Sequence, residues 1–413
     1  MRVLHVGKFF PPHPGGIERC CADLCEGLAA RGVATSVLAH AEPGTHHEVR
    51  REHDGIDVTL AACHGVMLHT PLSPGFMRAL ARTIKRFKPD LLHLHVPNPA
   101  VFYALLIPAA RRLPWVVHWH ADIPLDTHKL LLRLAYRLYR PWEQALLRRA
   151  AAVIVTSQPY LDSSEALAAW RDKTQVIPLG IRRIESDCVE DAKTGVASHP
   201  AGVVGPSPNP SSWPAAGLRI LAVGRLSFFK GFDVLLRALR ECSDASLLLI
   251  GDGECRDALQ RQAADLGIAA RVRFAGRLDM DAAGNAALLE AYAGADVFCL
   301  PSIERAESFG LVLLEAMRAR LPVVASAIAG SGVGYVVRDE ETGLLVPPKD
   351  VKALAGALRR LAADPDLRAK LGAAGAARFA AEFTLDRATE RVLASYQAIL
   401  KAAPDHAAAT PAE

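Results

Sequence analysis

The stretch that decides the fold of this chain reads Pro301-Ser302-Ile303-Glu304-Arg305-Ala306-Glu307-Ser308-Phe309-Gly310-Leu311-Val312-Leu313-Leu314-Glu315-Ala316-Met317. The apolar residues 297–300 before it predict a buried parallel strand that ends at Pro301. A polar loop follows, and Ser308 and Gly310 open a helix that we expect to run to about Arg320. This helix is apolar on most sides, which indicates that it packs inside a layered domain.

Two carboxylates stand out in this stretch. Glu315 lies in the second turn of the predicted helix, where a buried carboxylate must find hydrogen-bond donors. Glu307 precedes the helix N-terminus, where backbone N–H groups and the helix dipole favour anions. The pattern therefore predicts an anion site between two groups that accept hydroxyl hydrogen bonds, a layout that fits a nucleotide sugar. The alternative, a solvated Glu307 and a structural ion pair at Glu315, stays open at this point.

The spacing of the two carboxylates excludes one class of enzyme. Two helical residues eight positions apart would be separated by about 12 Å of rise. The paired carboxylates of a glycoside hydrolase lie roughly 5–9.5 Å apart. Glu307 and Glu315 are therefore better interpreted as contacting two ends of one ligand.

Length and composition describe a globular enzyme. The chain has 413 residues, 51% hydrophobic and 22% charged, which is enough for two domains with separate cores. It contains no apolar run long enough to predict a transmembrane helix, and residues 1–7 read as a first strand and not as a signal peptide. No two of the eight cysteines form a C-x-x-C pair. Cys21 and Cys25 lie on one predicted helix and are expected to face the core of the protein. We expect a cytoplasmic protein.

Charge is unevenly distributed along the chain. Residues 1–180 hold 21 Lys and Arg against 15 Asp and Glu, together with 13 of the 15 histidines. The basic excess is concentrated in residues 128–149, where apolar and basic side chains alternate. Such a segment can lie on the inner face of the cytoplasmic membrane as a peripheral contact, or it can be an ordinary solvated helix face. Nothing in the sequence predicts nucleic acid as a partner.

Strand and helix patterns alternate along the chain, which predicts α/β architecture with parallel sheets. In the first half we predict strands at residues 3–6, 35–38, 56–60, 91–94, 115–119, 153–156 and 175–177, and helices at 17–31, 74–87, 99–112, 129–149 and 159–170. In the second half we predict strands at 218–223, 246–250, 272–274, 296–300, 322–325 and 343–346, with three helices after residue 350.

The two halves begin alike, with a strand, a glycine and a cation in Arg2–Lys8 and again in Arg219–Arg225. We predict two Rossmann-like doubly wound domains that face each other across a cleft, with ligands beyond the carboxyl ends of the strands. We predict an N-terminal domain at residues 1–185, a flexible interdomain segment at 186–217 and a C-terminal domain at 218–384. A helix at 385–401 is predicted to return to the first domain, and a disordered tail follows at 402–413.

Cations and polar groups follow several predicted strands. In Gly224-Arg225-Leu226-Ser227-Phe228-Phe229-Lys230-Gly231 we place Arg225 at a strand end and Lys230 at a helix start, an arrangement that suits a diphosphate. Gly15-Gly16 precede a helix N-terminus in the first domain. Their backbone N–H groups could contact a phosphate, or the two glycines could form a plain turn. His120 and Asp122 follow the strand at 115–119, where they would point into the predicted cleft.

Two patterns raise the question of a metal. His93 and His95, and His118 and His120, alternate on strands and could ligate a metal, but packed histidines on one sheet face are the favoured interpretation. Asp279-Met280-Asp281 matches the D-x-D pattern of metal-dependent sugar transferases, although an N-cap explains it with less strain. We predict no metal and no cofactor.

Taken together, these motifs resemble a known family. Pro-Ser-x4-Glu-Ser-Phe-Gly-Leu-Val-x2-Glu-Ala-Met is similar to the signature of retaining GT-B glycosyltransferases of family 4. The companion elements occur in the same order: Gly15-Gly16, His120, Gly-Arg-x4-Lys-Gly at 224–231, Gly-Asp-Gly at 251–253 and the segment at 341–347. The forms His-Trp-His-Ala-Asp-Ile and Ile-Glu-Arg-Ala-Glu-Ser-Phe-Gly are similar to bacterial transferases that build O-antigen or exopolysaccharide, several of which use GDP-mannose.

The resemblance implies a donor half of the site. Glu307 would bind hydroxyls of the donor sugar, and Glu315 would hold the nucleotide ribose. The backbone groups of Phe309, Gly310 and Leu311 would contact the sugar or its phosphates.

The resemblance also implies roles for the remaining groups. Arg225 and Lys230 would neutralise the leaving diphosphate in place of a metal. Gly16 would let the donor phosphates approach the first domain, and His120 would stabilise the reacting sugar from the acceptor side. The implied partners are a nucleotide-sugar donor, GDP-mannose favoured, and a glycan or polyprenyl-diphosphate-linked acceptor.

Other functions fit parts of this pattern. A UDP-sugar-dependent transferase and a nucleotide-sugar epimerase share the fold, and the epimerase would need no acceptor. A dinucleotide oxidoreductase would require G-x-G-x-x-G after the first strand, which Gly7-Lys8-Phe9-Phe10-Pro11 does not supply. A non-catalytic sugar-binding protein would not need both carboxylates together with both cations.

Overall fold

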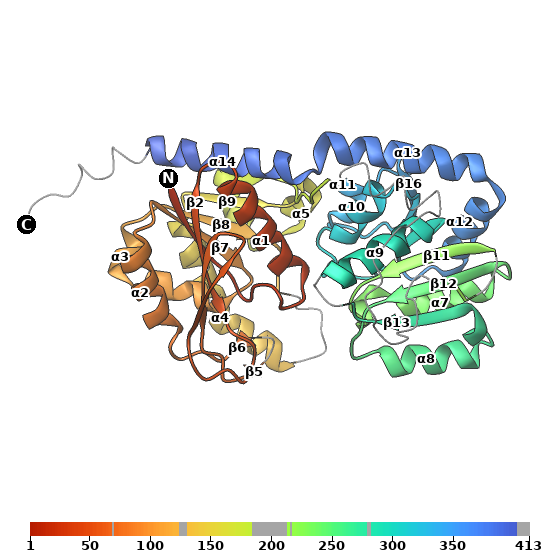
Figure 1. Ribbon diagram of the computed structural model, residues 1–413, viewed down its shortest axis with the longest axis horizontal. Helices are drawn as coiled ribbons and strands as arrows, with labels where there is room; N and C mark the ends of the chain where they lie inside the picture. Colours follow the sequence, from red (N-terminus) through yellow and green to blue (C-terminus); the bar gives the residue numbers. More distant parts are fainter. Residues whose placement is uncertain (68–69, 124–129, 184–212, 215–216, 279–281, 403–413) are drawn as a thin grey trace, which may run out of the picture. The chain divides into compact units, whose positions relative to one another are not determined.

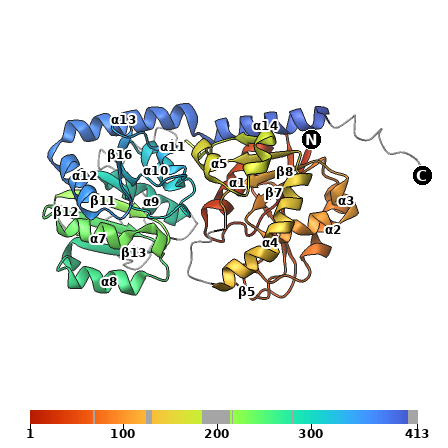
Figure 2. The same ribbon diagram turned by 180° about the vertical axis from the view of Figure 1, so that it is seen from behind.

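The computed structural model describes residues 1–67, 70–123, 130–183, 213–214, 217–278 and 282–402. The chain divides into two compact units, one of Met1–Gly180 with Leu385–Glu413 and one of Ile181–Thr384, called unit 1 and unit 2. Each unit is a sheet with helices on both faces (Figures 1 and 2), which confirms the α/β fold class. The predicted interdomain segment 186–217, the tail 402–413 and Asp279-Met280-Asp281 lie largely or wholly outside the described residues.

Unit 1 contains an eight-stranded sheet of order β10-β9-β8-β7-β1-β2-β4-β3, in which only β3 is antiparallel to its neighbour. Its elements are β1 (Arg2–Val6), α1 (Gly16–Ala29), β2 (Ala34–His40), β3 (Val49–His53), β4 (Ile56–Ala61), β5 (Val66–Met67), β6 (Thr70–Pro71), α2 (Phe76–Phe87), β7 (Leu91–Val96), the 3₁₀ helix η1 (Pro99–Leu105), α3 (Pro108–Arg111), β8 (Trp115–Trp119), α4 (Leu130–Arg149), β9 (Ala152–Val155), α5 (Gln158–Ser163), the 3₁₀ helix η2 (Ala168–Lys173), β10 (Thr174–Val176) and α14 (Leu385–Ala402).

Unit 2 contains a six-stranded parallel sheet of order β13-β12-β11-β14-β15-β16, which is the 3-2-1-4-5-6 order of a Rossmann fold. Its elements are β11 (Leu218–Val223), the 3₁₀ helix η3 (Phe228–Lys230), α7 (Phe232–Arg240), β12 (Ala245–Ile250), α8 (Arg256–Asp265), the 3₁₀ helix η4 (Ala269–Arg271), β13 (Val272–Gly276), α9 (Ala282–Gly294), β14 (Val297–Leu300), α10 (Leu311–Arg318), β15 (Val323–Ser326), α11 (Val333–Val336), β16 (Gly343–Val346), α12 (Val351–Ala363) and α13 (Pro365–Glu382).

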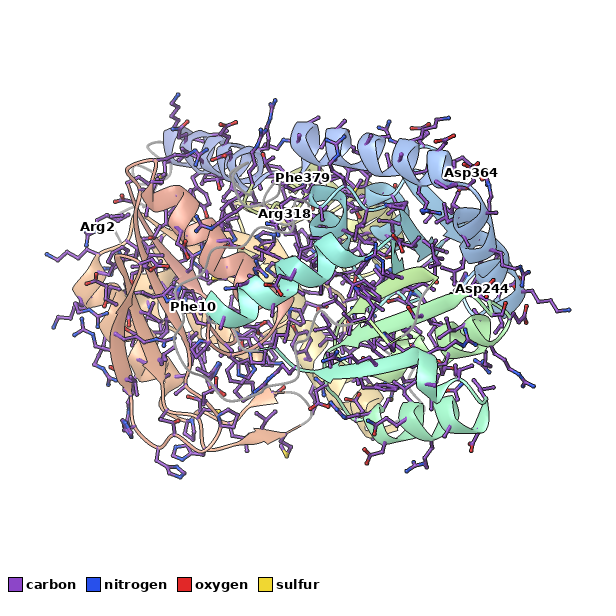
Figure 3. All side chains as sticks on the ribbon, turned by 45° about the vertical axis from the view of Figure 1, so that its right-hand side comes forward. Arg2, Phe10, Asp244, Arg318, Asp364 and Phe379 are labelled. Carbon is purple, nitrogen blue, oxygen red and sulfur yellow. The ribbon has the colours of Figure 1, made fainter. Side chains whose placement is uncertain are left out.

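Apolar side chains fill the space between each sheet and its helices (Figure 3). In unit 1, α14 packs against α1, and Tyr396 of α14 is fully buried beside Leu24 and Val3. In unit 2, α10 is buried through Leu313 to Met317, as its all-round apolar sequence predicts. Since residues 385–402 lie next to α1, the last helix belongs to the core of the first unit.

The prediction of one helix over residues 99–112 is wrong. The structure has η1 and α3 with Ile107 in an extended conformation between them. The cause is Pro108, whose ring disfavours the helical conformation of the residue before it. The predicted helix over 159–170 is likewise divided into α5 and η2, because Ser164 is extended and its hydroxyl donates to Asp122 Oδ1 at 2.8 Å.

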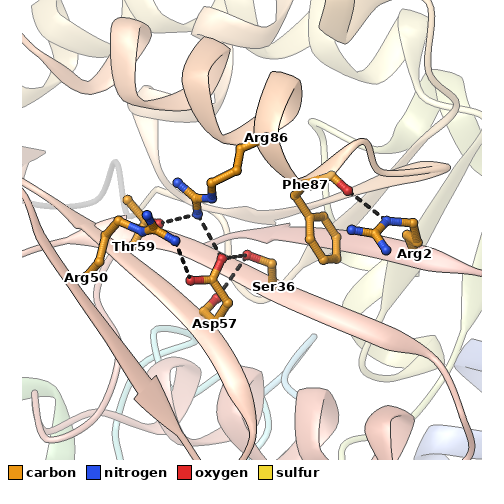
Figure 4. Close-up of polar contacts among 7 residues, drawn as sticks. All are labelled: Arg2, Ser36, Arg50, Asp57, Thr59, Arg86 and Phe87. Carbon is orange, nitrogen blue, oxygen red and sulfur yellow. Dashed lines mark hydrogen bonds and ion pairs between the residues drawn. The ribbon is translucent and has the colours of Figure 1, made fainter.

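Strand β3 was missed by sequence reasoning. It is an exposed edge strand rich in charged side chains, and it gives no hydrophobic signal. Polar contacts attach this edge (Figure 4): Arg86 of α2 and Arg50 of β3 donate to the two oxygens of Asp57 at 2.8 and 3.4 Å, and Ser36 donates to the same carboxylate at 3.2 Å. Burial alone would raise the pKa of Asp57, but the hydrogen bonds from Arg86 and Arg50 lower it overall.

Candidate active site

The strand order of unit 2 brings two distant loops together. In the 3-2-1-4-5-6 sheet, β11 and β14 are neighbours at the switch point, so the loops at their carboxyl ends lie against each other. The contact is direct, because the backbone N–H of Ile303 donates to the Phe229 carbonyl at 2.8 Å. Residues 224–231 and 301–310 therefore form one site.

Gly231 allows this close approach. It has a φ of +66°, and a Cβ at this position would lie 2.2 Å from the carbonyl oxygen of Pro301. Any side chain here would combine backbone strain with a steric clash against a backbone atom. The glycine of the predicted Gly-Arg-x4-Lys-Gly motif is thus explained by the contact between the two loops.

The centre of the site is a buried ion pair. Lys230 Nζ lies 2.6 Å from Glu307 Oε2, and the two side chains are only 12% and 9% exposed. Ser302 donates its hydroxyl to the same carboxylate oxygen at 2.8 Å, and the Ser331 hydroxyl donates to the backbone carbonyl of Glu307. Because Lys230 and Ser302 hold the carboxylate and Ser331 holds the backbone of the same residue, Glu307 is preorganised.

The N-terminus of α10 begins directly after this pair. Gly310, with a φ of +83°, is the N-cap, and Leu311 is the first helical residue. Glu307 is not helical, so the two carboxylates belong to different elements. The Phe309 side chain is buried edge-on against Phe383, which leaves its backbone as the only part that could contact a ligand. The N-terminus of a helix is suited to bind a phosphate.

Glu315 lies one turn further along α10. It is 6% exposed, and Tyr292 of α9 donates its phenolic hydroxyl to Glu315 Oε2 at 2.9 Å. The carboxylate therefore has a fixed orientation inside unit 2. Tyr292 itself is buried.

Arg225 is placed differently from Lys230. It lies in the loop two residues after β11 and not at the end of the strand. Its side chain is 65% exposed, and its guanidinium donates to Glu254 Oε2 at 3.2 Å. The described structure therefore brings Lys230 and Glu307 together but holds Arg225 at the neighbouring acidic group.

In unit 1, Gly16 is the first residue of α1 and Gly15 is its N-cap. A Cβ on Gly15 would lie 2.0 Å from the carboxylate of Glu18, which is 9% exposed in the first helical turn. Burial raises the pKa of Glu18, and burial lowers the pKa of Lys8, the cation that follows β1. Lys8 and Glu18, which interact electrostatically with each other, were not predicted as site residues.

His120 follows β8 and is 3% exposed. Its Nε2 lies 2.9 Å from His95 Nδ1, and its ring stacks on His118. Burial, together with the neighbouring histidines, lowers the pKa of His120 well below 6.5, so the imidazole is neutral. Asp122 has a structural role instead of the expected open position, because Trp119 Nε1 donates to its carboxylate at 2.7 Å and Ser164 does so at 2.8 Å.

Three residues that hold the predicted carboxylates were missed: Ser302, Ser331 and Tyr292. Ser302 lies within the quoted Pro-Ser motif, which was a usable signal. Tyr292 precedes the motif and Ser331 follows it. Only the fold shows that they contact its residues.

These features define a class of protein. Two Rossmann-like units, with a buried lysine–carboxylate pair at the N-terminus of a helix in the second, are the architecture of GT-B glycosyltransferases. A solved structure supports the fold: a sucrose-phosphate synthase from Thermosynechococcus elongatus has a TM-score of 0.74, at 23% identity, with 97% of this chain and 99% of that chain covered.

The sequence comparisons identify the family. Residues 208–378 match the family "Glycosyl transferases group 1", and residues 15–180 match the "Glycosyl transferase 4-like domain". A phosphatidyl-myo-inositol mannosyltransferase from Mycobacterium leprae is 33% identical and covers 91% of both chains. An O-antigen chain mannosyltransferase C from Escherichia coli is 29% identical over 97% of this chain and 99% of its own. The chain belongs to this glycosyltransferase family, which confirms the predicted resemblance, and it is an enzyme.

Proposed function

We propose that this glycosyltransferase moves a hexose, mannose from GDP-mannose in the favoured case, from a nucleotide sugar to a lipid-linked or polysaccharide acceptor in bacterial surface glycan synthesis, with retention of configuration. The observation that carries the proposal is the Lys230–Glu307 pair, held by Ser302 next to the N-terminus of α10. Two relatives are named as mannosyltransferases, one of O-antigen chains and one of phosphatidyl-myo-inositol, and their names support the choice of sugar and acceptor class.

In this proposal each group of unit 2 contacts one part of the donor. Glu307 accepts hydrogen bonds from hydroxyls of the sugar, and the N–H groups at Phe309, Gly310 and Leu311 contact the sugar or the phosphates. Glu315 accepts hydrogen bonds from the ribose, and Tyr292 fixes its orientation. The fixed orientation matters because a carboxylate that is already positioned loses little entropy when it binds.

The chemistry we propose is front-side displacement through an ion pair. The departing diphosphate oxygen accepts the acceptor's proton, so that no enzyme carboxylate need form a covalent intermediate. Lys230, and Arg225 if it leaves Glu254, would stabilise the negative charge that develops on the leaving group. Loss of one such interaction raises the barrier by about 2.7–4 kcal/mol.

In unit 1 we propose roles for Gly16 and His120. Gly16 begins α1 and would let a donor phosphate approach the backbone closely. His120 is neutral and buried, and its Nδ1 has no hydrogen-bond partner among the described residues. That nitrogen is available to a hydroxyl of the reacting sugar. Water exclusion on donor binding would suppress hydrolysis, the competing reaction.

A donor screen tests the proposal. The purified chain is heated with GDP-mannose, UDP-glucose, UDP-N-acetylglucosamine and ADP-glucose, each at several concentrations, and its unfolding temperature is recorded. Selective stabilisation by a GDP-sugar is expected, because binding to the native state stabilises it by mass action. Stabilisation by UDP-sugars alone would contradict the GDP-mannose assignment. Product analysis with donor alone separates a transferase from an epimerase, since only the epimerase converts the donor without an acceptor.

We further propose a peripheral membrane contact through α4. Leu134, Leu138 and Trp142 follow one another at four-residue intervals and are 49%, 78% and 43% exposed. Arg137 and Arg140 are exposed beside them. Apolar side chains flanked by arginines suit an anionic bilayer surface. Among the described residues, no helix is long and apolar enough to cross a membrane.

Vesicle sedimentation tests this contact. The chain should sediment with vesicles that contain anionic phosphatidylglycerol and much less with neutral vesicles. Leu138→Asp should reduce sedimentation, whereas Met77→Asp, at an exposed apolar position on α2, should not. Equal sedimentation of both variants would contradict a contact through α4.

A further inference from the structure

Unit 1 contains a buried cluster of imidazoles and thiols that the proposed reaction does not use in full. Three adjacent strands, β8, β7 and β1, contribute histidines to it, with His5 paired with His93 and His95 with His118 in register. Helix α1 contributes Cys21 and Cys25, one turn apart. The members, all 3% exposed or less, are His5, His93, His95, His118, His120, Cys21 and Cys25.

Within this cluster three potential ligands converge. One ring nitrogen of His5 and the sulfurs of Cys21 and Cys25 all lie within 4.8 Å of one another. They come from a strand and a helix that the hydrophobic core holds rigidly, since Cys21 and Cys25 pack among apolar residues of β2 and β4. Two thiolates and an imidazole are a donor set that thiophilic cations such as Zn²⁺ and Cu⁺ prefer.

The hydrogen-bond pattern around His5 supports a ligand at this place. His5 Nδ1 lies 3.2 Å from His95 Nε2, whereas His5 Nε2 is buried and has no hydrogen-bond partner among the described residues. A buried polar atom without a hydrogen-bond partner destabilises the fold. A metal-bound histidine, by contrast, uses one nitrogen for the metal and donates the other N–H to a neighbour. Since Nδ1 of His5 already has a neighbour and Nε2 has none among the described residues, Nε2 is the nitrogen that we assign to a metal.

We propose that Cys21, Cys25 and His5, the last through Nε2, bind a thiophilic metal ion, Zn²⁺ or Cu⁺, in the core of unit 1. The site is separate from the Lys230–Glu307 pair, and the metal does not contact the reacting groups. The sequence alone favoured packed histidines, because the two cysteines lie on a helix whose contact with the histidine strands is visible only in the fold.

The metal would determine which nitrogen of His120 carries the proton. With His5 Nε2 on the metal, the His5 proton is on Nδ1 and is donated to His95 Nε2. His95 then carries its proton on Nδ1 and donates this N–H to His120 Nε2 at 2.9 Å. Because His120 Nε2 accepts this hydrogen bond, the proton of His120 is on Nδ1. That is the nitrogen without a partner, which becomes a hydrogen-bond donor. This consequence rests on the proposed function of His120, whereas the metal site does not.

Metal content is the first test. The untagged chain, produced with zinc and copper supplied and passed through chelator-treated buffer, should retain about one equivalent of one of these metals by elemental analysis. The Cys21→Ala/Cys25→Ala double variant should retain less than about a tenth of that amount. Cys20→Ala, at the adjacent buried cysteine outside the cluster, should retain it fully. Absence of metal from the native chain, or its full retention by the double variant, would overturn the proposal.

Cobalt spectroscopy keeps the test decisive if the double variant fails to fold. The native chain produced with Co²⁺ should show thiolate-to-cobalt charge-transfer absorption, and a bound cobalt without these bands would overturn the ligand assignment. The outcome is independent of the donor screen, because the proposed donor contacts do not include His5, Cys21 or Cys25. Donor stabilisation without metal would refute this site and leave the proposed function intact.

Discussion

The Lys230–Glu307 pair permits a test that separates structure from catalysis. Lys230→Met removes the cation and leaves a carboxylate that is 9% exposed, with Ser302 as its remaining donor at 2.8 Å. Breaking a buried pair by removing one partner costs about 3–5 kcal/mol, and the Ser302 hydrogen bond places the expected loss near the lower end, about 3 kcal/mol. The double variant Lys230→Met/Glu307→Gln removes both charges and should unfold within about 1 kcal/mol of the native chain.

Activity should not follow stability in this series. If both groups act on the donor, Glu307→Gln, Lys230→Met and the double variant each lose about a hundredfold or more in kcat, corresponding to about 2.7–4 kcal/mol. The assays are urea unfolding by circular dichroism, hydrogen exchange of residues 297–318, and nucleotide-diphosphate release. Arg219→Met is the control, because the Arg219–Asp296 pair in the same unit is 42% and 23% exposed and should cost about 1 kcal/mol or less, with normal kcat. A double variant that regains both stability and activity would show that the pair is only structural.

Three further predictions follow from particular contacts. Burial raises the pKa of Glu143 to about 7 from 4.5, so the contribution of the protonated side chain to stability is complete below pH 4.5 and is lost as pH rises through 7. Glu143→Gln should therefore raise the free energy of unfolding at pH 8 by about 3 kcal/mol. It should not raise the free energy at pH 4.5, and urea titrations at the two pH values measure both effects. Tyr292→Phe removes the donor to Glu315 and should raise the donor KM by about fivefold with kcat unchanged, which steady-state kinetics can check. Gly231→Ala, with its Cβ 2.2 Å from the Pro301 carbonyl, should abolish GDP-sugar stabilisation in the thermal assay, and an unaltered response would contradict the described loop contact.

The carboxylates and the lysine of the site could be predicted from the sequence because they lie in contiguous motifs. That Lys230 and Glu307 touch could not, since it depends on β11 and β14 being neighbours in the sheet. Strand order is set by the packing of whole helices, not by the local pattern. The contact of Arg225 with Glu254 could not be predicted either, since it also depends on which strands are neighbours.

The fold was predicted best where hydrophobic periodicity is strong. Strands such as β8 and β11 agree with their predicted bounds, because each is mostly apolar and mostly buried. Reasoning failed where one residue overrides a longer pattern, as Pro108 does after η1. It failed again at β3, whose exposed charged residues carry no burial signal.

The configuration of the product during turnover tests the central claim most directly. The purified chain is supplied with GDP-mannose and a polyprenyl-diphosphate-linked acceptor, and the anomeric carbon is followed by NMR from the first minutes. We expect release of GDP, dependent on the acceptor, and a new glycosidic bond with the α configuration of the donor. A product of inverted configuration, or consumption of the donor without an acceptor and without transfer, would contradict it.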